Sequence, residues 1–244
     1  MENQRSVSVK DWYARGWNTY RENPKNLMLG SLVVSGLSVL FTLVNALTGG
    51  QWVILLSQFF ITPVLGVGWL YLCLLTERGN KPGFEVLFSA FKRYGRVWVT
   101  YILFILLVVA GVFLAVVPGV LWSLRYGMSL FTVMDTSRYA RDAFRYSKGI
   151  TKGSLGKLFV AALLAAVLSG LSVPFSMGIQ KIGTGTAAPF LIFGFLPFLA
   201  GVLVISPWIG SSIASAYERL AAAGNEAPED EREGKWPEAK GTKK

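Results

Sequence analysis

Residues 27–47 read LMLGSLVVSGLSVLFTLVNAL, and residues 52–75 read WVILLSQFFITPVLGVGWLYLCLL. Neither stretch contains a charged residue, and each is as long as the run of about 20 apolar residues with which a helix crosses the hydrocarbon core of a bilayer. The intervening Thr48-Gly49-Gly50-Gln51 is polar and predicts a tight turn. The two runs therefore predict a helical hairpin in a membrane.

The same pattern continues along the chain. The predicted spans are residues 27–47, 52–75, 97–117, 119–135, 156–174 and 189–216. Only 16% of the 244 residues are charged and 52% are hydrophobic, whereas about 25% of an average soluble domain is charged. The sequence thus predicts an all-α fold, a polytopic membrane helical bundle with six transmembrane helices, forming a single membrane domain over residues 1–223.

The basic residues predict the orientation of this bundle. Every Lys and Arg except Arg125 and Lys181 lies before the first span, after the last, or, counting Lys157 at the edge of the fifth span, in a loop that an even number of spans separates from the N-terminus. Such a bias predicts that both termini face the cytoplasm, in the inner membrane of a bacterium or archaeon. The net charge of +10 comes in short blocks between apolar runs, so topology explains it better than a nucleic-acid partner does. Residues 1–26 lack the apolar core of a cleavable signal.

Three segments in the predicted cytoplasmic loops have aromatic or small residues at helical spacing, with Lys and Arg opposite. The segments contain Val9, Trp12, Tyr13, Gly16, Trp17 and Tyr20; Phe84, Leu87, Phe88, Phe91 and Tyr94; and Ala140, Ala143, Phe144 and Ser147. This spacing predicts three cytoplasmic amphipathic helices in the interface, in contact with anionic membrane lipids. They could instead pack beneath the bundle as a cytoplasmic cap, and both interpretations stay open.

Each amphipathic segment precedes two spans, and Ile61-Thr62-Pro63 in the second span is echoed by Ile205-Ser206-Pro207 in the sixth. One interpretation is a three-fold parallel repeat about an axis along the membrane normal; the other is chance similarity. Residues 224–244 are rich in Glu, Lys and Pro and predict a disordered cytoplasmic tail.

The composition excludes several kinds of chemistry. The chain has no histidine and one cysteine, Cys73, which excludes an intrachain disulfide, Cys/His zinc sites and Ser-His or Cys-His nucleophile pairs. No pair of carboxylates lies within the predicted spans. We therefore expect no enzymatic activity, no metal and no cofactor.

Several residues in the spans are candidates for a structural or functional role. Pro63, Pro197 and Pro207 each remove a backbone donor and predict kinks, with Thr62 and Ser206 placed to bind the freed carbonyls. Small residues spaced four apart predict close packing within the bundle or, alternatively, a homo-oligomer. Asp135 is predicted to cap the amphipathic helix that follows it.

Arg125 is the one charge well inside a predicted span. An arginine at mid-span costs about 2.5–3.5 kcal/mol on insertion scales, so it usually faces the bundle or a wet cavity. The side chain could reach the interface by snorkelling or bind backbone carbonyls of a kinked helix. The third interpretation is an anion site, for instance for a lipid phosphate, because guanidinium offers a planar bidentate fork.

A pattern of short motifs extends from residue 117 to residue 153. It consists of Val117-Pro118-Gly119-Val120, Leu124-Arg125-Tyr126 and Met134-Asp135, followed by Ala143-Phe144-Arg145-Tyr146-Ser147 and Lys152-Gly153. It resembles that of the YciC-like uncharacterised inner-membrane proteins and is similar to the membrane domain of some glycerophosphoryl diester phosphodiesterases. The resemblance implies a multi-helix membrane domain without an established activity. An acidic residue often follows the aspartate in that family, whereas this chain has Thr136.

These observations predict a non-enzymatic membrane scaffold or accessory protein that acts through its basic cytoplasmic face on lipids or protein partners. The alternative is a transporter-like protein with a small anion or lipid site near Arg125.

Overall fold

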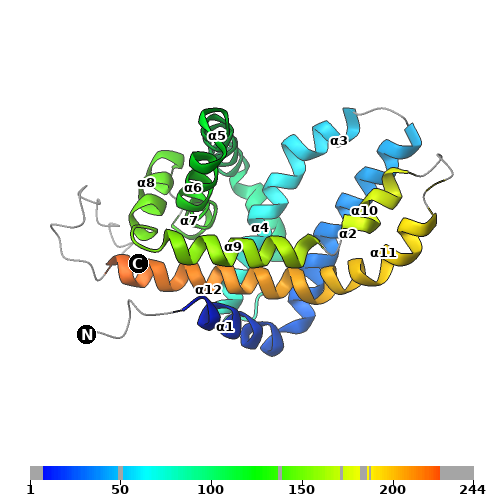
Figure 1. Ribbon diagram of the computed structural model, residues 1–244. Helices are drawn as coiled ribbons and strands as arrows, with labels where there is room; N and C mark the ends of the chain where they lie inside the picture. The colour runs from blue at the N-terminus through cyan, green and yellow to red at the C-terminus, as the bar shows by residue number, and fades with distance from the viewer. Residues whose placement is uncertain are drawn as a thin grey trace.

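The computed structural model describes residues 8–48, 52–136, 139–170, 173–181, 186 and 188–225, and all regular structure within them is helical (Figure 1). The α-helices are α1 (Val9–Glu22), α2 (Pro24–Thr48), α3 (Trp52–Leu56), α4 (Thr62–Glu77), α5 (Tyr94–Leu114), α6 (Val116–Tyr126), α7 (Ser129–Asp135), α8 (Ala140–Ile150), α9 (Leu155–Gly170), α10 (Val173–Gln180), α11 (Ala188–Ala200) and α12 (Ser206–Asn225). Two π-helical turns, η1 (Ser57–Ile61) and η3 (Gly201–Ile205), and the 3₁₀-helix η2 (Phe84–Arg93) complete the elements. The predicted all-α class is confirmed.

The described residues contain four helical segments that are long and apolar enough to cross a membrane. They are Pro24–Thr48, Ser57–Glu77, Phe84–Leu114 and Ala188–Gly224. Ala140–Ile150 and Leu155–Gly170 together would make a fifth, although they meet at 104°. Large apolar side chains such as Phe113 (88% exposed) and Phe193 (79%) lie on the surface of these segments, as expected of side chains that face lipid. The chain is a helical membrane protein.

The predicted span over residues 119–135 is broken in the structure. Gly127 and Met128 form a turn between α6 and α7, and neither helix alone could cross a membrane. The predicted spans over residues 97–117 and 119–135 place the turn between them at Pro118, but the structure places it earlier. It lies at Ala115, whose backbone is extended, so Pro118 falls within the first turn of α6, where its missing N–H removes no helical hydrogen bond.

The buried core lies where α4 and α12 meet. Leu65, Leu72 and Leu74 of α4 and Ala214 and Tyr217 of α12 are almost inaccessible to solvent. A Cβ atom on Gly210 would lie 2.7 Å from the Sγ atom of Cys73, so a small residue lets the two helices approach closely. From this core, α5 and α6 diverge on one side and α2, α10 and α11 on the other (Figure 1).

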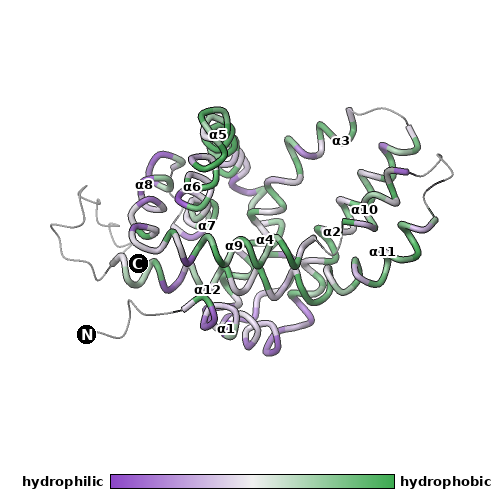
Figure 2. Tube along the Cα trace, in the orientation of Figure 1, coloured by the Kyte–Doolittle hydropathy of each residue, from purple (hydrophilic) through white to green (hydrophobic). Residues whose placement is uncertain are grey.

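Helices occupy all three positions predicted to be amphipathic. α1 packs along α12, with Gly16 against the backbone of Ser212, and η2 packs along α4, where Gly68 meets the carbonyl of Leu87. α8 packs against α7 and the end of α12. Figure 2 shows that α1 and α8 carry many hydrophilic residues, whereas α5 and α11 are largely hydrophobic.

The predicted disordered tail over residues 224–244 lies outside the described residues from position 226 onward. Gly224 and Asn225 belong to the last turn of α12.

Candidate functional site

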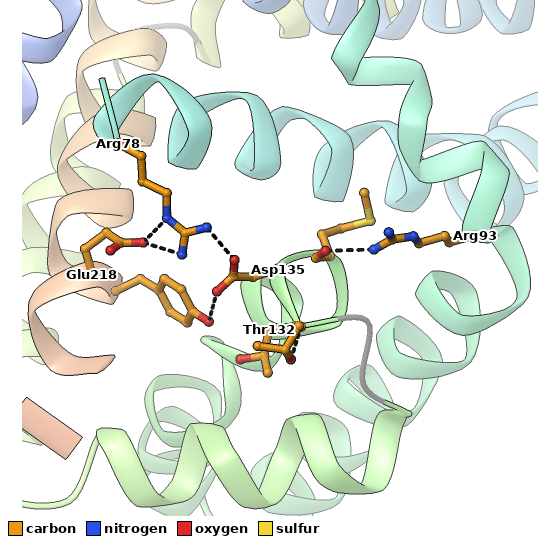
Figure 3. Close-up of polar contacts among 8 residues, drawn as sticks. Arg78, Arg93, Thr132, Asp135 and Glu218 are labelled. Carbon is orange, nitrogen blue, oxygen red and sulfur yellow. Dashed lines mark hydrogen bonds and ion pairs between the residues drawn. The ribbon is translucent and has the colours of Figure 1, made fainter. Parts of the chain in front are cut away.

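Arg78 joins the ends of two helices to a third helix. It follows Glu77, the last residue of α4, and its Nη1 atom lies 2.5 Å from Oδ1 of Asp135, the last residue of α7 (Figure 3). Its Nε and Nη2 atoms lie 2.7 and 2.6 Å from Oε1 of Glu218 on α12. The planar guanidinium thus binds one carboxylate through two nitrogens and a second through its third nitrogen, which the ammonium of lysine could not do.

Asp135 has a second partner. The hydroxyl of Tyr217 donates to Oδ2 of Asp135 at 3.0 Å, and the Tyr217 ring stacks on Phe131 with centroids 5.2 Å apart. Next to this cluster, Arg93 of η2 donates to the backbone carbonyl of Met134 at 2.8 Å. The hydrogen bond to Asp135 and the attraction of both carboxylates raise the pKa of Arg78 above its usual value, so the guanidinium keeps its charge. We call Arg78, Asp135, Tyr217 and Glu218 the charge cluster.

The position of Asp135 differs from the predicted helix cap. α8 begins after Tyr139, which makes no side-chain capping hydrogen bond, and the Asp135 carboxylate points instead to Arg78 and Tyr217. An ion pair and a phenol hydroxyl satisfy this carboxylate better than one backbone N–H would.

Glu77 is a buried carboxylate beside the charge cluster, and its side chain is only 1% exposed. It accepts a hydrogen bond from the Thr19 hydroxyl and pairs with Arg15, both on α1. A buried carboxylate without a partner would be strongly destabilising, so these contacts fix α1 against the end of α4.

Pro63 and Pro207 each follow a π-helical turn, and side chains from other elements bind the carbonyls of that turn. Trp98 Nε1 donates to the carbonyl of Phe59 at 2.9 Å, and Tyr94 donates to that of Phe60 at 3.2 Å. Among the described residues, these carbonyls receive no hydrogen bond from Thr62, which corrects the expected local partner.

The same arrangement recurs before Pro207. The Tyr20 hydroxyl donates to the carbonyl of Leu203 at 3.1 Å, and Ser31 donates to that of Val202 at 2.5 Å. Here too the donors come from α1 and α2 rather than from the neighbouring Ser206. Pro197 lies inside α11.

Arg125 lies in the last turn of α6, half-buried and beside α8. Its backbone carbonyl accepts hydrogen bonds from Ser147 at 2.8 Å and Thr151 at 3.2 Å. Within the described part of the chain, its guanidinium forms no ion pair. The structure therefore places the Arg125 backbone next to an amphipathic helix, and it does not bring Arg125 into contact with the charge cluster.

The amphipathic helices expose cations and aromatic rings together. On η2, Phe88 is 45% and Phe91 38% exposed, and the exposed Lys92 adjoins them. The Arg96 guanidinium lies 4.9 Å from the centre of the Tyr139 ring, which is 67% exposed. Such a surface suits the headgroup region, where rings insert and cations meet phosphates.

Arg78, Glu77, Glu218 and Tyr217 were not predicted as site residues. Their partners lie 57 to 140 residues away in the sequence, so no local pattern reveals the contacts. One signal was available: Glu77-Arg78, Asp135 and Glu218-Arg219 all stand at or near the predicted cytoplasmic ends of spans. Comparison with protein-family models, curated proteins and solved structures found no match to this chain.

Proposed function

We propose that this chain is a non-enzymatic scaffold or accessory protein of the inner membrane, acting through its basic cytoplasmic face on anionic lipid. The observation that carries the proposal is the exposed pairing of aromatic rings and cations on the helices around the charge cluster, above all Phe88, Phe91 and Lys92. We also propose that the chain belongs to the YciC-like family.

A six-span topology with cytoplasmic termini is part of this proposal. The charge cluster supports it, because the last residue of α7 and the residue after α4 meet Glu218, about two turns before the end of α12. In a six-span bundle the cytoplasmic ends of the second, fourth and sixth spans would lie on this same side. The three-fold repeat gains support from the two proline turns, η1 and η3, whose carbonyls are bound in the same manner.

The lipid preference can be measured by native mass spectrometry of the full chain in neutral detergent, with equal amounts of phosphatidylglycerol and phosphatidylcholine. We expect more bound phosphatidylglycerol, because each cation near an anionic surface contributes about 1 kcal/mol. Replacing Lys92, Arg145 and Lys148 by Gln should reduce that preference, whereas Lys181→Gln, on the predicted opposite side, should not. Equal binding of both lipids by the unaltered chain would refute the proposal.

A transporter-like protein with an anion site at Arg125 is the second candidate. It is favoured by one observation: the half-buried guanidinium forms no ion pair within the described residues. Arg125→Leu should then fold but lose stabilisation by added inorganic phosphate in a thermal shift assay, and Arg125→Lys should restore only part of it because lysine lacks the bidentate fork. If the unaltered chain shows no phosphate-dependent shift, this candidate is eliminated.

A further inference from the structure

One face of α8 carries a continuous row of cations. Arg141, Arg145, Lys148 and Lys152 follow one another at intervals of four, three and four residues and are all exposed, the last in the turn after the helix. This spacing places them along one side of the helix. Ala143, Ser147 and Ile150 are buried on the other side. We call the four cations the basic stripe.

The basic stripe lies next to the end of α12. A Cβ atom on Gly224 would come within 3.0 Å of Cγ2 of Ile150, so the last turn of α12 packs directly on the buried face of α8 (Figure 1). The chain therefore leaves α12 beside α8. The opposite end of α12 is far away, about 30 Å along a helix of 20 residues.

The residues that come next in the sequence are strongly acidic. Residues 226–233 read EAPEDERE, with five carboxylates and a single arginine. Eight residues can extend to about 26 Å, and the basic stripe covers about 16 Å along the helix axis. The acidic segment is thus long enough to cover the stripe, and it begins within two residues of the contact between Gly224 and Ile150.

We propose that residues 226–233 dock on the basic stripe of α8 and compete there with anionic lipid headgroups. The competition rests on the proposed lipid-binding function, whereas the docking does not. Charge complementarity identifies the occupant: the segment has five carboxylates and the stripe has four cations. The segment is also tethered two residues from the contact between Gly224 and Ile150, which raises its effective concentration at the stripe. By this means the chain would regulate its own contact with the membrane.

Carbodiimide cross-linking of the full chain in neutral detergent tests the docking. This reagent joins amines to carboxylates that touch, and mass spectrometry locates the bonds. We expect bonds from Lys148 and Lys152 to carboxylates of residues 226–233, weakened by added salt. Lys25 is the matched control. It is also exposed, but it follows α1, whose Tyr20 reaches Leu203 just before the far end of α12. The docking would be overturned if Lys25 and Lys148 formed bonds to residues 226–233 in equal yield, or if neither Lys148 nor Lys152 formed such bonds.

Native mass spectrometry with phosphatidylglycerol tests the competition. Each exposed ion pair changes an equilibrium by a factor of about 1.5 or more, so the variant Glu229→Gln, Asp230→Asn, Glu231→Gln, which loses three pairs, should bind this lipid at least about threefold more tightly. Adding Arg145→Gln and Lys148→Gln should abolish that gain. If the cross-links form but the carboxylate variant binds no more lipid, the competition with lipid is contradicted and the docking is not. If neither the unaltered chain nor any variant prefers phosphatidylglycerol, the proposed function fails while the cross-links still decide the docking.

Discussion

At the scale of residues, the charge cluster depends on one side chain. Arg78 is 35% exposed, while Asp135 is 15% and Glu218 31% exposed, so water screens these ion pairs in part. Single exposed pairs contribute little. Here, however, one guanidinium satisfies two carboxylates, and the less exposed carboxylate also accepts from Tyr217. Removing Arg78 would leave Asp135 with a neutral partner only.

We expect Arg78→Leu to lower the free energy of unfolding by about 1–2 kcal/mol. For a chain of this size the melting temperature should fall by about 2–8 °C. Arg78→Lys should lower the melting temperature by a smaller amount, because an ammonium keeps the charge but cannot reproduce the fork. Thermal unfolding in detergent measures both, with the exposed Lys81→Leu as control. An unchanged melting temperature for Arg78→Leu would show that apolar packing alone holds α4, α7 and α12 together.

At the scale of elements, the prolines act through side chains on other helices. Pro63 cannot donate to the turn before it, and the π-helical geometry of η1 leaves the carbonyls of Phe59 and Phe60 to Trp98 and Tyr94 of α5. The Trp98 ring also stacks on Phe60, with centroids 5.9 Å apart. The π-helical turn in one span is thereby joined to the neighbouring span, and η3 is joined to α1 and α2 in the same way.

This coupling predicts a non-additive pair of substitutions. Trp98→Phe removes the donor to Phe59 but keeps an aromatic ring on Phe60, so it should cost about 1 kcal/mol. Pro63→Ala restores an N–H that can bond to the Phe59 carbonyl within a regular helix. In that background Trp98→Phe should therefore cost much less. A double-mutant cycle on melting temperatures measures the difference, and strictly additive effects would contradict the coupling.

Sequence reasoning predicted the elements better than their contacts. Run length and helical spacing predicted α2, α5 and the amphipathic helices, because apolar length alone decides those segments. It missed the break at Gly127 and Met128, where the run is short and a single glycine is all that marks the turn. It predicted kinks at the prolines, with Thr62 and Ser206 as partners, but it did not predict the π-helical turns that precede Pro63 and Pro207. The true donors lie 34 to 183 residues away, beyond any local pattern.

At the scale of the whole molecule, the charge cluster and the lipid-facing surface divide the protein into two ends. Ion pairs tie the ends of α4 and α7 to α12, and amphipathic helices surround them, while exposed rings such as Phe113 and Phe193 lie on the helices that diverge from the core. Charges are expelled from hydrocarbon and rings are accepted by it. The molecule therefore has one end suited to the aqueous surface and another suited to the bilayer.

This division predicts which positions a membrane-impermeant thiol reagent reaches. Cys73 is the sole cysteine and is buried, so Cys73→Ala gives a background for single-cysteine variants with little change in packing volume. In that background Lys92→Cys and Lys148→Cys should react only in inside-out vesicles, because the helices that carry them surround the charge cluster. Lys181→Cys, after α10, should react in intact spheroplasts, because the positive-inside bias places its loop on the other side.

Ala115→Cys, in the turn between α5 and α6, should behave like Lys181→Cys if α6 and α7 together return the chain to the cytoplasm. If Ala115→Cys reacts from the same side as Lys148→Cys, the six-span topology is refuted. The other variants would still test the orientation of α2 and α4.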